Sequence, residues 1–261
     1  MAQKPETADL FEHFAPLMSR GVSGDRAGLD RRYLLASEGD FEVYYAPFDF
    51  VQTQARVVLV GITPGMVQAK NALAEARRQL QAGASHEEAK HRVKSAASFS
   101  GPMRTNLIQL LDEIGVNEWL GISSSAELFG SKRDLVHYTS VLRYPVFYRG
   151  KNYNGTPSPL KSRFLMGQVE HWFADDLKQL PRAVFVPLGA VPKQVLTSMA
   201  DDGRIEYSRI LDGLPHPSGA NAERIAYFLG NKDRERCSAK CNPELLDQAK
   251  RRLVDKVAAL E

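Results

Sequence analysis

The chain has 261 residues, of which 34 are Lys or Arg and 31 are Asp or Glu, so its formal net charge is +3. Hydrophobic residues make up 43% and charged residues 25%, a balance that is typical of globular proteins and excludes a disordered or fibrous one. No stretch approaches the roughly 20 apolar residues of a membrane-spanning helix, and the N-terminus is too polar for a signal peptide. We therefore expect a cytoplasmic protein with no membrane partner.

The first strong signal along the chain is a buried strand. Residues 1–40 are polar and contain one short amphipathic helix, and residues 41–46, followed by Pro47, indicate an edge strand or an extended segment. Residues 56–62 are a run of branched aliphatic side chains that ends in a turn with Gly and Pro. This pattern predicts a parallel strand that is buried on both faces.

Helices and strands then alternate. Helices are predicted over 67–82, from the capping box of Ser85 and Glu88 onward, and over 103–116, before a strand at 135–142. Residues 143–163 have no consistent period and mix cations with tyrosines, which predicts a long functional loop. The remaining elements are a helix at 164–180, strands at 183–188 and about 207–214, a helix at 222–229 and a last helix capped by Asn242.

Strands separated by helices imply a parallel sheet with helices on both faces, and such sheets bind ligands outside the carboxyl ends of their strands. The motif GITPG (61–65) follows the first strand, and LPHPSGAN (214–221) follows the fourth. Glycines let a backbone approach a ligand, and the helix start after GITPG offers unpaired N–H groups to an anion. His216 is restricted by prolines on both sides, and Ser218 can cap the helix that follows. The structural alternative is an ordinary tight turn and a surface histidine.

These two segments resemble the uracil-DNA glycosylase superfamily, whose members carry G-x-x-P-[GY] after the first strand and H-P-S after the last. The segment Ser98-Phe-Ser-Gly101 looks like the family's base-stacking phenylalanine segment. Residues 136–145 look like its second-strand motif, and residues 184–190 are similar to its third strand. The resemblance covers roughly residues 40–230, and four weak motifs in the right order make it specific.

The resemblance implies a three-layer α/β sandwich around a short central parallel sheet of four strands in the order 2-1-3-4. It also implies one domain over 1–261, with residues 1–40 and 231–261 peripheral. The implied function is a monofunctional DNA glycosylase that flips a base out of single- or double-stranded DNA and hydrolyses its N-glycosidic bond, in repair or in phage defence. We expect a monomer without a metal or an organic cofactor.

The residues that match the family's motifs, or that could replace them, form the predicted site. His216 is expected to donate a hydrogen bond to the departing base, Thr63 to hold water and Asp49 to replace a missing carboxylate, with Asp212 as the second choice. The expected base-binding residues are Gly61, Ile62, Gly65, Phe99, Thr139 and Ser140. The expected DNA-binding residues are Pro217, Ser218, Gly219, Asn221, Arg224, Arg149 and Lys151, with further cations at 90–94.

Two positions depart from the family. Thr63 stands where uracil-specific members have Asp, Asn or a nearby Glu, and a hydroxyl cannot act as a carboxylate base. Thr139 or Ser140 stands where the family reads uracil with Asn, and a hydroxyl cannot present the paired donor and acceptor of an amide.

These departures leave three hypotheses open. The protein could remove uracil slowly. It could excise another base, such as a damaged base or a modified cytosine in phage DNA. It could also be a catalytically inactive DNA- or nucleotide-binding module that keeps the fold. A doubly wound nucleotide-binding enzyme is a further rival, but the sequence has no Walker lysine and no GxGxxG.

Overall fold

The computed structural model describes residues 9–21, 28–96 and 101–260. The chain divides into two compact units. Unit 1 comprises residues 1–51, 62–98 and 140–175, and unit 2 comprises residues 52–61, 99–139 and 176–261. The single domain expected over 1–261 stays a prediction.

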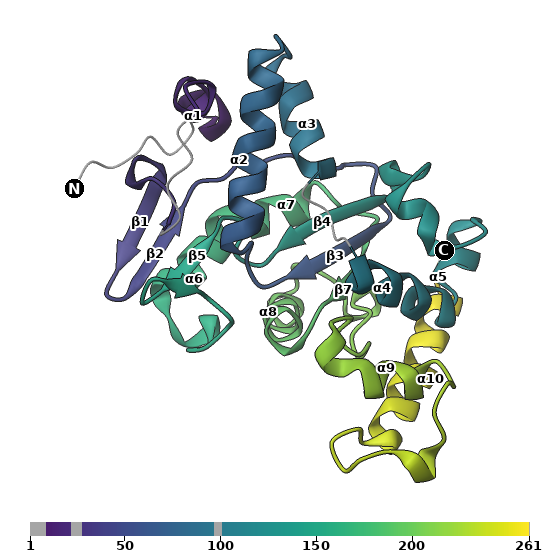
Figure 1. The fold of residues 1–261 in the computed structure, drawn as a ribbon. Coiled ribbons are helices and arrows are strands. Elements are labelled where there is room, and N and C mark those ends of the chain that lie inside the picture. The colour runs from purple at the N-terminus through teal and green to yellow at the C-terminus, as the bar shows by residue number, and fades with distance from the viewer. Residues whose placement is uncertain (1–8, 22–27, 97–100, 261) are drawn as a thin grey trace. The chain divides into compact units, whose positions relative to one another are not determined.

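The sheet of unit 2 has three strands in the order β4-β3-β7 (Figure 1). They are β3 (Val57–Gly61), β4 (Val136–Ser140), whose last residue belongs to unit 1, and β7 (Val184–Pro187). β3 and β7 run parallel, with Val57 beside Val184. The strands predicted at 56–62, 135–142 and 183–188 are thus present, in the first three places of the expected order.

The fourth predicted strand, at about 207–214, is wrong. Tyr207–Arg209 form a 3-10 turn, and Ile210 makes only an isolated parallel bridge with Phe185. Gly213 then takes a φ of +120°, a conformation that side chains oppose, and the chain leaves the sheet. The parallel sheet therefore has three strands instead of the four expected.

Both faces of this sheet are covered. Val57 and Leu59 point into a core cluster that also holds side chains of α4, α9 and α10, while the intervening Val58 and Val60 are equally buried. Because side chains alternate along a strand, both faces must exclude water, as the predicted layered α/β class requires. The helices of unit 2 are α4 (Gly101–Glu113), α5 (Val116–Leu120), α8 (Ala190–Asp201), α9 (Ala222–Phe228) and α10 (Pro243–Ala258).

Unit 1 contains a second sheet that the sequence analysis missed. It is ordered β1-β2-β5-β6, with antiparallel neighbours, from β1 (Leu34–Glu38), β2 (Phe41–Tyr44), β5 (Val146–Tyr148) and β6 (Lys151–Asn152). The predicted edge strand at 41–46 lies between two partners, and the predicted loop at 143–163 contains a hairpin. Strands this short show no clear alternation of apolar and polar residues, so they can be recognised only from the strands with which they pair.

The helices of unit 1 agree better with the sequence. They are α1 (Leu10–Ser19), α2 (Met66–Gln81), α3 (His86–Ala96) and α6 (Arg163–Gln168). A π-helical turn (Val169–Phe173) and α7 (Ala174–Lys178) continue the helix predicted over 164–180, and α7 ends in unit 2. The predicted capping box is present, because Ser85 and Glu88 bond each other's backbone N–H groups.

Candidate functional site

His216 is half-buried in the loop that leads from the sheet of unit 2 to α9. Pro215 and Pro217 on either side of it are buried. The backbone N–H of Ser218 donates to Nδ1 of His216 at 3.2 Å, and Oγ of Ser218 lies 3.0 Å from the same nitrogen. Nδ2 of Asn221 donates to that Oγ at 3.2 Å, which leaves the hydroxyl hydrogen of Ser218 for His216.

These contacts select one form of the imidazole. A backbone N–H can only donate, so Nδ1 accepts and the neutral ring carries its hydrogen on Nε2. Burial lowers the pKa of His216 below its ordinary value, which also favours the neutral ring. The arrangement can therefore present an uncharged N–H donor at Nε2.

Two further residues of unit 2 contact this loop. Nδ2 of Asn106, on α4, donates to the carbonyl oxygen of Pro217 at 2.9 Å. Gly189, directly before α8, has a φ of +106°, and a Cβ on it would lie 3.5 Å from Cδ2 of His216. A side chain at 189 would be strained by its backbone, and its Cβ would touch the ring at ordinary van der Waals distance. Neither residue was predicted, because an isolated Asn in a helix and a Gly after a strand have no distinctive pattern.

Gly61 and Thr139 stand at the carboxyl ends of neighbouring strands in unit 2, as predicted. Gly61 is the last residue of β3, and Thr139 is the next to last of β4. Oγ1 of Thr139 is buried and has no hydrogen-bond partner among the described residues. An unmet buried hydroxyl costs stability unless a ligand or water bonds it, so this group suits a ligand-reading role.

The predicted DNA-binding residues 217–224 follow His216 directly. Ser218 does not cap a helix through its side chain, because its Oγ bonds His216, so that expectation is wrong. Gly219 and Asn221 lie in a 3-10 turn, and Arg224 lies in the first turn of α9. Nε of Arg224 is buried and makes no hydrogen bond to the described part of the chain.

The rest of the GITPG turn belongs to unit 1 and is held by internal hydrogen bonds. Oγ1 of Thr63 donates to the carbonyl of Tyr144 at 2.9 Å and accepts from the N–H of Val146 at 3.0 Å. This leaves one lone pair for a water.

The start of α2 is capped by two side chains. The N–H of Gly65 donates to Oε1 of Gln68 at 3.0 Å, and the N–H of Met66 donates to Oδ1 of Asn152 at 2.9 Å. The N–H groups of Gly65 and Met66 are thus engaged, so the expectation that the helix start offers unpaired N–H groups to an anion is wrong for these two.

Asp49, in unit 1, is bonded by two tyrosines. The hydroxyl of Tyr45 donates to one carboxylate oxygen at 2.9 Å and the hydroxyl of Tyr144 to the other at 2.6 Å. Burial raises the pKa of Asp49 despite these donors and the nearby charge of Arg143. Both oxygens are thus engaged in a polar cluster, which leaves them less able to activate a water.

Asp212, the other carboxylate considered, is enclosed by cations of unit 2. Its Oδ2 lies 2.8 Å from Nζ of Lys193, and its Oδ1 lies 3.7 Å from Nζ of Lys256. Burial acts to raise its pKa, but Lys193, Lys256 and Arg252 outweigh burial and hold it below the ordinary value. An ion-paired carboxylate with a lowered pKa is a weak base.

Five predicted residues remain. Arg149 and Lys151 are exposed in and beside the β5–β6 turn, and Nε of Arg149 is 2.7 Å from Oδ2 of Asp40. Ser140 ends β4, and Ile62 follows β3. Phe99 lies outside the described residues.

The predicted site residues thus divide between the units. Unit 2 holds Gly61, Thr139, His216, Pro217, Ser218, Gly219, Asn221 and Arg224, and unit 1 holds Asp49, Ile62, Thr63, Gly65, Ser140, Arg149 and Lys151.

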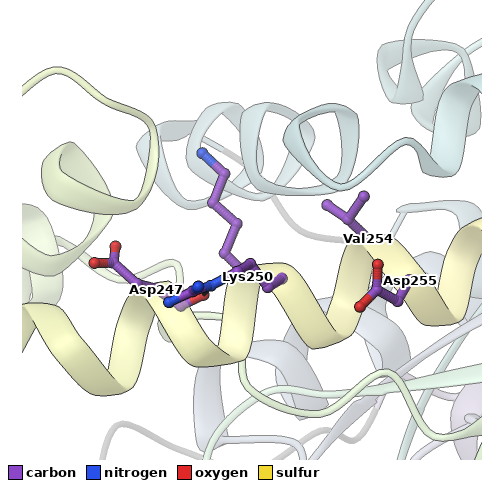
Figure 2. Close-up of a pocket in the computed structure, with 5 residues that line it drawn as sticks. Asp247, Lys250, Val254 and Asp255 are labelled. Atoms are coloured by element: carbon purple, nitrogen blue, oxygen red, sulfur yellow. Dashed lines mark hydrogen bonds between the residues drawn. The ribbon is translucent and has the colours of Figure 1, made fainter.

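A hollow of about 370 Å³ lies elsewhere, along α10, and none of the predicted site residues lines it (Figure 2). Asp247 and Lys250 at its wall already pair with Arg234 and Glu113. Within the described ranges, no three His, Cys, Asp or Glu side chains are grouped to hold a metal ion. No helix in the described part is long and apolar enough to cross a bilayer.

Comparison with known proteins gives one informative match. The chain is 38% identical over 207 residues to Uncharacterized protein YoxB of Bacillus subtilis (strain 168), across 77% of this chain and 80% of that protein. No family model matches the chain, and no solved structure matches it. The extent and identity of the match mean that the chain belongs to the same family as YoxB.

Proposed function

We propose that the protein is a monofunctional DNA glycosylase that excises a uracil-like, damaged or modified base. The observation that carries the proposal is the state of His216, a neutral ring whose Nδ1 is occupied and whose Nε2 carries a hydrogen. This is the donor that the reaction requires, because the base leaves with its bonding electrons and develops negative charge on an oxygen.

The proposed reaction has two parts, departure of the base and addition of water to the sugar. The N-glycosidic bond breaks, its electron pair stays with the base, and Nε2–H of His216 stabilises the base oxygen. A water oxygen then bonds the sugar carbon and a proton of that water passes to solvent, so water is the co-reactant. With Thr63 engaged and Asp49 bonded by two tyrosines, stabilisation of the leaving base is the main contribution that the described residues support.

The unmet hydroxyl of Thr139 supports a substrate wider than uracil. A hydroxyl can rotate to donate or to accept, whereas an amide presents one donor and one acceptor in fixed places. This flexibility suits a modified cytosine in phage DNA or a damaged base as well as uracil. DNA is accordingly the proposed partner, and the mechanism assigns no step to a metal or cofactor.

The proposal is tested with DNA duplexes and single strands that contain uracil, deaminated purines, mismatched thymine or modified cytosines. We expect the wild type to release one of these bases and His216→Ala to release it about 10²–10³ times more slowly, the cost of one lost transition-state donor. The exposed His171 gives a matched control, and His171→Ala should keep the wild-type rate.

Release of free base is measured by chromatography, and abasic sites by strand cleavage with alkali. The proposal that the protein is an enzyme is contradicted if no base is released while wild type and His216→Ala bind DNA equally well. That result would favour the inactive binding module. Equal rates in His216→Ala and wild type would contradict the role of His216.

A further inference from the structure

Asn106, a half-buried residue of α4, makes a polar contact to the carbonyl of Pro217, the residue after His216. Its Nδ2 donates to that oxygen at 2.9 Å across 111 positions of sequence. Pro217 has no N–H of its own, so its carbonyl is its only polar backbone group.

The loop is also anchored on its other side. Leu214 lies in the same core cluster as Leu107, the neighbour of Asn106 on α4, and Pro215 is buried. α4 therefore bonds the loop after His216, while Leu214 before His216 lies in the core cluster to which α4 also contributes. With Leu214 and Pro215 buried on one side and Pro217 bonded to α4 on the other, the ring between them has little freedom to shift.

We infer that Asn106 is a positioning residue, which holds the 214–217 segment so that Nε2 of His216 faces the departing base. The effect of Asn106 on catalysis rests on the proposed function. Its effect on the position of the His216 ring does not, because that position can be observed without activity. A misplacement of about 1 Å can cost about 100-fold in rate, so a residue that never touches substrate can still limit catalysis.

The test compares Asn106→Leu with Asn106→Gln. Leucine nearly keeps the branched shape of asparagine and removes the donor, whereas glutamine keeps the amide. Gln109 is exposed on the same helix, so Gln109→Leu is the matched control for placing leucine on α4. Thermal unfolding shows whether each variant folds. If Asn106→Leu does not fold, Asn106→Gln is compared with the wild type in its place.

Two readouts separate positioning from a merely structural role. We expect Asn106→Leu to lower kcat for base release about 10- to 100-fold, with KM within about twofold because the DNA contacts remain. Asn106→Gln should recover part of the loss. In ¹⁵N NMR of the imidazole ring, His216 should carry its hydrogen on Nε2 in the wild type and populate both tautomers in Asn106→Leu.

The NMR readout does not require activity. If the wild type releases no base but the tautomers of His216 mix in Asn106→Leu, the proposed function fails and the hold on the ring stands. If Asn106→Leu matches Gln109→Leu in both kcat and ring spectrum, the inference about Asn106 is overturned. The inference would also be overturned if kcat and KM of Asn106→Leu changed by the same factor while the spectrum of the His216 ring stayed as in the wild type.

Discussion

The imidazole of His216 is held by donors that fit only its neutral form. Burial lowers its pKa from the ordinary 6.5, and the N–H of Ser218 bonds an Nδ1 that must be unprotonated. Protonating the folded ring is therefore harder than protonating the unfolded one. The stability that this group contributes is complete above pH 6.5 and is lost as pH falls through the lowered folded-state pKa.

The same coupling predicts the pH dependence of catalysis. Base release should be constant above pH 6.5 and fall in acid, with its midpoint below 6.5, because only the neutral ring occupies the bonds described. Ser218→Ala removes a hydroxyl donor to Nδ1 and should move this midpoint to higher pH. Rates of single-turnover base release between pH 4 and 8 check this, and a midpoint that stays in place would contradict the assigned role of the hydroxyl.

At the scale of elements, an ion-pair cluster holds the segment that replaces the missing fourth strand. Asp212 pairs with Lys193 of α8 and lies near Arg252 and Lys256 of α10. Nζ of Lys256 also donates to the carbonyl of Ile210 at 2.8 Å. Side chains of two helices thus position a chain segment that has almost no ladder of backbone hydrogen bonds to the sheet.

We expect Asp212→Asn to lower the free energy of unfolding at neutral pH by about 1–2 kcal/mol, since a partly exposed charge-assisted pair is lost. The pKa of Asp212 is lowered from 3.8, so its contribution is present above 3.8 and disappears as pH falls through the lowered value. Urea unfolding at pH 7 and pH 3 measures both. Asp202→Asn, in an exposed pair at 4.0 Å, should have little effect, and an equal loss in both variants would contradict the prediction.

At the scale of the whole molecule, the net charge of +3 is small, and two of the cations predicted to contact DNA are paired within the protein. Lys90 is buried against Asp9 and Glu87, and Arg149 pairs with Asp40. Cations that are already neutralised release fewer counterions when DNA binds. The DNA surface is therefore expected to be weaker than a count of Lys and Arg suggests.

Lys151, exposed beside the turn that holds Arg149, allows a direct comparison. Lys151→Ala should lower the slope of log Kd against log salt by about 0.9, the value for one phosphate contact. Arg149→Ala should change that slope less, because Asp40 already balances its charge. Fluorescence anisotropy with labelled DNA from 50 to 200 mM salt, the range in which phosphate contacts are lost, checks both. Equal changes in the two variants would contradict the assignment.

The sequence by itself determined three strands of the parallel sheet, two helix starts and His216 as the leading candidate. Aliphatic runs must be buried, Pro and Gly restrict φ locally, and capping residues bond their own neighbours, so these features depend on short-range chemistry. The capping box at Ser85 and the start of α10 at Asn242 and Pro243 agree with this reading.

Only the tertiary structure decided the features that depend on partners distant in sequence. The strand β5 pairs with β2 and in turn with β6, and residues 207–214 fail as a strand because they make only one isolated bridge to the sheet, at Ile210. The same holds for three side chains of the predicted site and its surroundings. The hydroxyl of Thr63 bonds Tyr144, Asp212 pairs with Lys193, and Asn106 bonds Pro217, which lies 111 positions away in the sequence. The sequence determines which hydrogen bonds and charges a side chain can offer, but tertiary packing determines which partner it meets and so whether it remains available.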